Sequence, residues 1–178
     1  LSLSELAMQA DSAAAPTVSS VAISGATNAQ NSLLNTGDVV SVTVTFSSAV
    51  TVNTSGGTPS IAIDIGGVSR SAAYSSGSGT TSIVFAYTIA SSETTDTDGI
   101  SIGANAISLN SGTMKDSSNQ NATLTHSAVS ANSSFKVDTT APTISSVSLA
   151  SDNSTATVTF SEDVYTCLLY TSDAADDR

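Results

Sequence analysis

The sequence feature that most constrains the fold is a strict alternation of apolar and polar residues. Val40, Val42, Val44 and Phe46 alternate with serine and threonine. Successive side chains of a β-strand point to opposite faces, whereas a helix repeats about every 3.6 residues, so this pattern predicts a strand with one buried and one wet face. Val and Thr are β-branched, which suits a pleated, half-buried surface.

The same alternation returns along the chain, in residues 61–65, 83–89, 100–109 and 135–137. Clusters of Gly, Asn, Asp and Ser separate these segments, and no stretch has a convincing helical period. Roughly seven or more short strands with such turns predict an all-β fold, an antiparallel β-sandwich with Greek-key connections. A β-barrel is the alternative. At the turn after Lys115, Asn119 is expected to take the left-handed conformation that glycine usually supplies.

Two blocks of sequence occur twice in the same order. Residues 15–23 (APTVSSVAI) return as residues 141–149 (APTISSVSL), and residues 42–47 (VTVTFS) return as residues 156–161 (ATVTFS). Two matched blocks in one order indicate a tandem duplication. We therefore expect one complete repeat at residues 15–140 and the truncated start of the next repeat at residues 141–166.

Both ends of the chain depart from this pattern. Residues 1–14 lack the basic and continuous apolar regions of a signal peptide, so we expect an N-terminal edge or the end of a preceding repeat. Residues 167–178 begin with the only cysteine, Cys167. Their first ten residues (CLLYTSDAAD) resemble the translation of a transposase-type sequencing adapter. We therefore expect a non-native tail there, and a native part without cysteine.

Charge excludes several classes of partner. The chain has 15 Asp and Glu against 4 Lys and Arg, a formal net charge of −11. Such a field repels nucleic acid and anionic lipid, and we expect neither as a partner. No apolar run approaches the roughly 18 residues of a membrane-spanning helix, so no direct membrane insertion is expected. At 39% apolar residues the chain is nevertheless too hydrophobic for a disordered acidic tail.

Several segments carry a resemblance to a known family. They are residues 37–52 (GDVVSVTVTFSSAVTV), 58–67 (TPSIAIDIGG), 72–90 (AAYSSGSGTTSIVFAYTIA), 107–116 (ISLNSGTMKD), 135–147 (FKVDTTAPTISSV) and 157–164 (TVTFSEDV). In this order they resemble the tandem Ig-like repeats of very large bacterial surface and secreted proteins. The resemblance implies an Ig-like sandwich that serves as a stalk or spacer in adhesins, beside neighbouring repeats of the same chain, and that sometimes binds Ca²⁺ at domain junctions.

The sequence offers little to catalysis. His126 is the only histidine, and its strand-like surroundings predict a solvent-facing side chain rather than a general base. No G-x-S-x-G motif occurs. A glycosidase-type pair would have to come from residues such as Asp64 and Glu93, whose separation the sequence does not give. We therefore do not expect an enzyme.

Calcium binding is the more plausible chemistry, because carboxylates spaced two apart in a loop can converge on one ion. Residues 93–99 (ETTDTDG) supply Asp96 and Asp98, with a solvated acidic loop as the alternative. The second candidate is the junction between repeats, where Asp138 and Glu162 lie. These four residues are the predicted metal ligands.

The expected function is a structural spacer of a large extracellular bacterial adhesin or surface protein, supporting cell adhesion. The alternative is a carbohydrate- or surface-binding accessory module of a secreted multidomain protein or hydrolase. Sugar-binding faces usually present Trp or Tyr platforms. The chain has no Trp, and Tyr74 and Tyr87 fall in alternating segments that predict core or rim positions.

Overall fold

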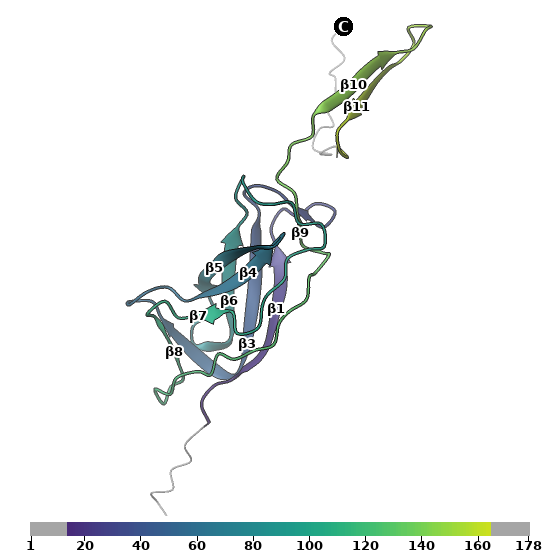
Figure 1. The fold of residues 1–178 in the computed structure, drawn as a ribbon. Coiled ribbons are helices and arrows are strands. Elements are labelled where there is room, and N and C mark those ends of the chain that lie inside the picture. The colour runs from purple at the N-terminus through teal and green to yellow at the C-terminus, as the bar shows by residue number, and fades with distance from the viewer. Residues whose placement is uncertain (1–13, 165–178) are drawn as a thin grey trace, which may run out of the picture. The chain divides into compact units, whose positions relative to one another are not determined.

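The computed structural model describes residues 14–164, which divide into two compact units between Thr139 and Thr140 (Figure 1). All regular secondary structure in these residues is β-strand, so the predicted all-β class is confirmed. The predicted N-terminal edge up to residue 13 and the predicted adapter-derived tail lie outside the described residues.

The first unit contains nine strands. In chain order they are β1 (Val18–Ala26), β2 (Leu33–Leu34), β3 (Val39–Asn53), β4 (Ser60–Ile65), β5 (Val68–Ser76), β6 (Thr80–Thr88), β7 (Ile107–Ser108), β8 (Thr113–Lys115) and β9 (Lys136–Val137). The main sheet has the order β1-β3-β6-β5-β4-β7, with β8 paired to the C-terminal end of β3. All of these pairs are antiparallel, whereas β2 and β9 form a short parallel pair.

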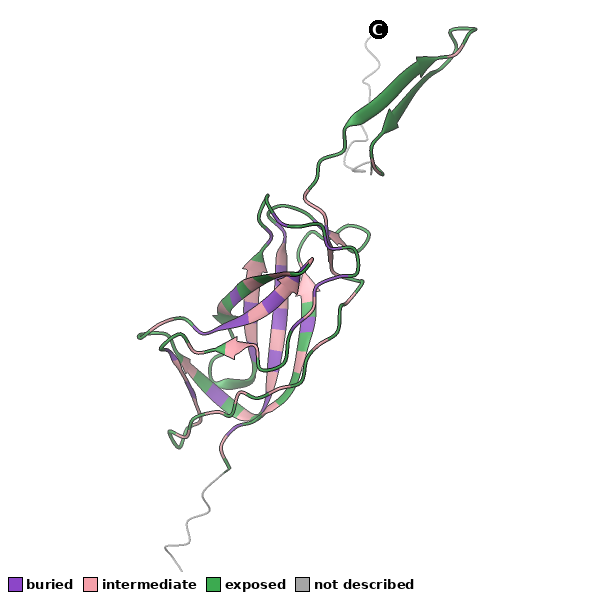
Figure 2. Cartoon of the chain, viewed as in Figure 1, coloured by how far each residue is buried: buried purple, intermediate pink, exposed green. Residues whose placement is uncertain are grey.

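The alternation predicted for residues 40–46 is confirmed in β3. Val40, Val42 and Val44 are completely buried and Phe46 is 2% exposed. Figure 2 shows buried and half-buried residues alternating along this strand. The polar row between them was expected to lie in water, but it is half-buried. The reason is that β3 is a central strand, so its neighbours β1 and β6 shield its outer face from both sides.

The sheet curls around one hydrophobic core. Isolated β-bridges extend the backbone pairing beyond β4 and β7: Asp64 pairs with Ser101, and Ile102 pairs with Val129. A further pair joins residues 17 and 123 at the start of β1. The core inside the curl takes buried side chains from β1, β3, β4, β5, β6 and the later segments. This architecture is consistent with a β-sandwich.

One predicted segment differs from the structure. Of residues 100–109, only Ile107–Ser108 forms a strand, although Ile100 and Ile102 are buried in the core. The chain turns at Asn105, whose φ is 54°. Ser101 before the turn and Ile107 after it both pair with β4, so the turn interrupts the ladder before a longer strand can form. The left-handed conformation expected at Asn119 is confirmed, with φ of 64°.

The second unit contains a β-hairpin, in which β10 (Ile144–Leu149) pairs antiparallel with β11 (Ala156–Phe160). Its register is that of β1 with β3. Ile144 lies opposite Phe160 and Val147 opposite Val158. The residues at the matching sequence positions of the first unit are opposite each other in the same way, and both pairings have an irregularity directly after the first pair. The pairing of β1 with β3 has a second irregularity between Ile23 and Gly25.

The end of each hairpin is closed by the same hydrogen bonds. In the first unit the Ser47 N–H donates to the carbonyl of Thr17 at 2.9 Å, and in the second the Ser161 N–H donates to the carbonyl of Thr143 at 2.8 Å. Both serine hydroxyls also accept the N–H of the same threonine, at 3.0 and 2.9 Å. The repeated sequence blocks therefore fold into the same local structure.

Candidate functional site

The acidic loop that follows β6 separates its carboxylates between the interior and the solvent. Glu93 is 7% exposed and Asp96 is 2% exposed, whereas Asp98 is exposed. A calcium loop needs several oxygens that converge on one point. This loop instead turns two of its three acidic side chains inward.

Asp96 holds three segments together. One carboxylate oxygen accepts the Gly99 N–H at 2.7 Å within the loop, and the other accepts the Gly66 N–H at 3.0 Å from the β4–β5 turn. Its backbone exchanges two hydrogen bonds with Val137 of β9, at 2.8 and 3.0 Å. Backbone N–H groups aimed at a carboxylate stabilise its negative charge without water. Asp96 is therefore a structural crosslink, which the sequence-based interpretation did not foresee.

Glu93 forms a second polar cluster with two residues of the sheet. The Arg70 Nε–H donates to Glu93 Oε2 at 2.7 Å, and the Tyr87 hydroxyl donates to Glu93 Oε1. The Glu93 side chain has no exposed surface, while that of Arg70 keeps 31%. An acid desolvated in this way needs its partners, because losing one leaves a buried charge. The cluster ties the loop to β5 and β6.

The cluster also changes the protonation of its members. Burial raises the pKa of the Tyr87 hydroxyl, and the hydrogen bond to Glu93 adds to this shift. The hydrogen bond to Glu93 also raises the pKa of the Arg70 guanidinium. Tyr87 therefore stays neutral and Arg70 stays charged, which keeps both as donors to the buried carboxylate. The chain has only 4 Lys and Arg. An arginine within a strand of such a chain is the sequence signal that could have indicated the ion pair of Arg70 with Glu93.

The other two predicted ligands lie in separate units. Asp138 belongs to the first unit and Glu162 to the second, so a junctional calcium site stays a prediction. Within residues 14–164, no three His, Cys, Asp or Glu side chains gather closely enough to hold a metal ion. At the loop, both oxygens of Asp96 accept backbone N–H groups, whereas Asp98 is exposed, and calcium binding there also stays a prediction.

The His126 side chain forms hydrogen bonds to the backbone of two other residues. Its Nε2 accepts the Ala106 N–H at 2.9 Å, and its Nδ1 lies 2.8 Å from the carbonyl of Ser127. Since the carbonyl can only accept, the proton belongs on Nδ1. The side chain is half-buried, which differs from the predicted solvent-facing position because the turn at residues 104–106 packs over it.

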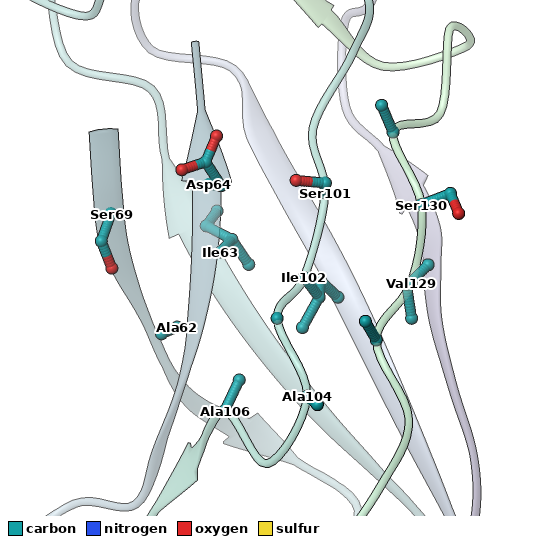
Figure 3. Close-up of a pocket in the computed structure, with 13 residues that line it drawn as sticks. Ala62, Ile63, Asp64, Ser69, Ser101, Ile102, Ala104, Ala106, Val129 and Ser130 are labelled. Atoms are coloured by element: carbon teal, nitrogen blue, oxygen red, sulfur yellow. The ribbon is translucent and has the colours of Figure 1, made fainter. Parts of the chain in front are cut away.

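A shallow groove of about 640 Å³ lies on the surface of the first unit. Figure 3 shows that its lining comes from three neighbouring stretches: β4 with the start of β5, residues 101–106, and residues 128–131. Most of the lining residues are alanine or serine, and Asp64 supplies the one carboxylate among them. One oxygen of Asp64 accepts the Gly67 N–H at 2.9 Å. The groove offers a mainly apolar surface with a few serine and carboxylate oxygens, and no aromatic residue lies in its lining.

The two tyrosines of the sheet, Tyr74 and Tyr87, make contacts within the first unit. Tyr74 packs edge-on against Phe85, with ring centroids 6.4 Å apart, and its hydroxyl accepts the Ser78 N–H at 3.2 Å. The Tyr87 hydroxyl donates a hydrogen bond to Glu93. The core or rim positions predicted for these two residues are therefore the observed ones.

Comparison of the chain with protein-family models, with curated proteins and with solved structures found no match. In the part of the chain that the structure describes, no helix has the length and apolar character needed to span a bilayer.

Proposed function

We propose that the chain is part of a tandem array of Ig-like repeats, and that the first unit is a structural spacer in a large extracellular bacterial surface protein or adhesin. A spacer needs a self-contained fold that can be joined end to end. The core of the first unit lies entirely between Ile23 and Val137, and includes no residue of the second unit.

One observation carries the proposal. The hairpin of the second unit repeats the pairing of β1 with β3 in register, irregularity and closing hydrogen bonds. A second copy of the opening hairpin, placed directly after the first unit, is what a tandem array requires. Independent origin of both the sequence match and the shared irregularity is a much less economical explanation.

The strand order supports the Ig-like, Greek-key part of the proposal. In the order β3-β6-β5-β4, three consecutive strands joined by hairpins return to lie beside the strand that precedes them. This arrangement corresponds to the Greek-key motif that most β-sandwiches contain. The motif was expected from strand number and from the resemblance to bacterial Ig-like repeats.

A polyprotein tests the spacer function. Increasing numbers of copies of residues 15–140, each followed by its own linker sequence, should extend the maximum dimension in small-angle X-ray scattering by a constant increment per copy. The same array, placed between a bacterial surface anchor and a known adhesive domain, should preserve adhesion under flow. A maximum dimension that stays constant as copies are added would contradict a spacer.

The groove near Asp64 favours one second candidate, a carbohydrate- or surface-binding accessory module. Its serine and carboxylate oxygens could accept hydrogen bonds from sugar hydroxyls. A glycan array probed with the whole chain distinguishes the two functions. Saturable binding that is lost in Asp64→Ala would favour the accessory module over the spacer.

Calcium at the repeat junction belongs to the proposal through the resemblance, with Asp138 and Glu162 as ligands. An ion present at a hundredfold over its Kd stabilises a fold by about 2.7 kcal/mol, which corresponds to roughly 8 °C or more in Tm. Thermal melts of the whole chain in EDTA and in millimolar Ca²⁺ measure this shift. Asp138→Asn and Glu162→Gln should abolish it, and identical wild-type melts would remove calcium from the proposal.

A further inference from the structure

The hairpin of the second unit exposes side chains that the first unit buries. Val147 is 65% exposed, Val158 is 44% exposed and Phe160 is 37% exposed, and Figure 2 shows β10 and β11 as exposed along their whole length. At the matching positions of the first unit, Val44 is completely buried and Phe46 is 2% exposed. In the first unit this apolar row continues into the neighbouring strand, since Ile83 and Phe85 of β6 are buried in the same core.

In the first unit the matching strand has a second neighbour. β3 pairs with β1 on one edge and with β6 on the other, where Val42 lies opposite Phe85 and Val44 opposite Ile83. In the second unit, β11 pairs with β10 and with no other described strand. Within residues 14–164, the edge of β11 that corresponds to the β6 side of β3 therefore has no partner strand.

The backbone of β11 presents hydrogen-bonding groups along this edge. The N–H of Ser161 points toward β10, since it donates to Thr143. Backbone groups of successive strand residues point to alternate sides, so the N–H and C=O of Ala156, Val158 and Phe160 point away from β10. Unpaired groups in such a row are a template for a further strand.

We propose that this open edge of β11 is an acceptor site for a β-strand with the sequence pattern of β6. The added strand runs antiparallel to β11, with the equivalent of Ile83 opposite Val158 and the equivalent of Phe85 opposite Ala156. Main-chain hydrogen bonds provide the affinity, and the alternating apolar side chains provide the register. A hairpin of two strands is marginal on its own, so a third strand also stabilises it. The proposal does not rest on the spacer function.

A peptide of residues 79–90 with a lysine tag for solubility and a fluorescein label is the probe. Fluorescence anisotropy with the whole chain should show saturable binding. A control peptide with Ile83→Ser and Phe85→Ser keeps the backbone but removes the apolar row, and it should not bind. Hydrogen exchange should slow at the amides of Val158 and Phe160 when the first peptide is bound.

Two proline variants locate the edge. Val147 and Val158 lie opposite each other, and by the alternation their N–H groups point to the two outer edges of the hairpin. Proline removes that N–H but is tolerated on an edge. Val158→Pro should weaken peptide binding by about tenfold or more, because it removes a ladder donor and blocks the approach of the strand. Val147→Pro should leave the binding unchanged.

Each other outcome contradicts the proposal. Binding that survives Val158→Pro would mean that the peptide replaces β6 within the first unit, and binding lost only in Val147→Pro would place the acceptor on β10. A chain that dimerises on its own in sedimentation, with peptide binding absent, would assign the apolar row to a second copy. Failure of the β6 peptide to bind the monomeric chain would remove the acceptor site altogether.

Discussion

The role of Asp96 as a crosslink predicts a large loss of stability when its carboxylate is removed. Asp96→Ala leaves the buried N–H of Gly99 and the half-buried N–H of Gly66 without an acceptor. Each hydrogen bond to a charged group contributes about 1.5–3 kcal/mol, so the free energy of unfolding should fall by about 3–6 kcal/mol. Asp96→Asn keeps one acceptor oxygen but directs an amide NH₂ at the other donor, and should lower it by about 2–3 kcal/mol.

Equilibrium unfolding in urea, followed by far-UV circular dichroism, measures these changes. The midpoint should move to lower urea while the slope m stays the same, because the surface exposed on unfolding does not change. A domain of this size loses roughly 3–5 °C in Tm for each kcal/mol. Asp96→Ala should therefore lower Tm by roughly 10 °C or more.

Asp98 provides the matched control. It lies two residues away in the same loop, is exposed, and carries the same charge, so Asp98→Ala and Asp98→Asn should change stability by less than about 0.5 kcal/mol. Equal effects at both positions would refute the crosslink. The stability lost through each substitution should be the same in EDTA and in millimolar Ca²⁺. If the cost of Asp96→Ala disappeared in EDTA, together with part of the wild-type stability, the carboxylate would be a calcium ligand instead.

Three further predictions concern the glycines, the buried polar cluster and the core. Gly99→Ala should lower the free energy of unfolding by more than Gly67→Ala in urea titrations: both glycines have positive φ, but only at Gly99 would a Cβ meet backbone atoms. Since the pKa of Tyr87 is raised in the folded protein, its contribution to stability should be complete below about pH 10 and be lost as the pH rises through the folded value. Urea titrations between neutral and alkaline pH should show this loss, and Tyr87→Phe should abolish it. Phe85→Ala should lower the free energy of unfolding by about 3–5 kcal/mol, measured in the same way, because Phe85 has no exposed surface.

Strand positions were predictable because the alternation of side chains is a local property. The buried row of β3 and the buried isoleucines of β4 follow directly from a period of two. The left-handed turn at Asn119 was predictable for the same reason, since it depends on the residue type and its neighbours. Ile100 and Ile102 show the limit: their burial was predicted correctly, but their backbone groups pair with Phe135 and Val129, which lie outside any regular strand, so no longer ladder forms.

The candidate site was harder to predict, because the use of a carboxylate depends on what surrounds it. Asp96 and Asp98 look alike in the sequence, and both were predicted as calcium ligands. The structure surrounds Asp96 with backbone N–H groups from two turns and leaves Asp98 in solvent. The partners of Glu93 come from β5 and β6, so no spacing within its own loop could indicate them.

The sequence by itself therefore determined the all-β class, the buried rows of β3, β4 and β6 and the recurrence of the opening hairpin. All three depend on near neighbours along the chain. Only the tertiary structure decided the strand order, the inward turn of Asp96 and the open edge of β11. These depend on pairing between distant segments. Buried backbone groups must form hydrogen bonds, and which distant groups they bond to decides the role of each polar side chain nearby.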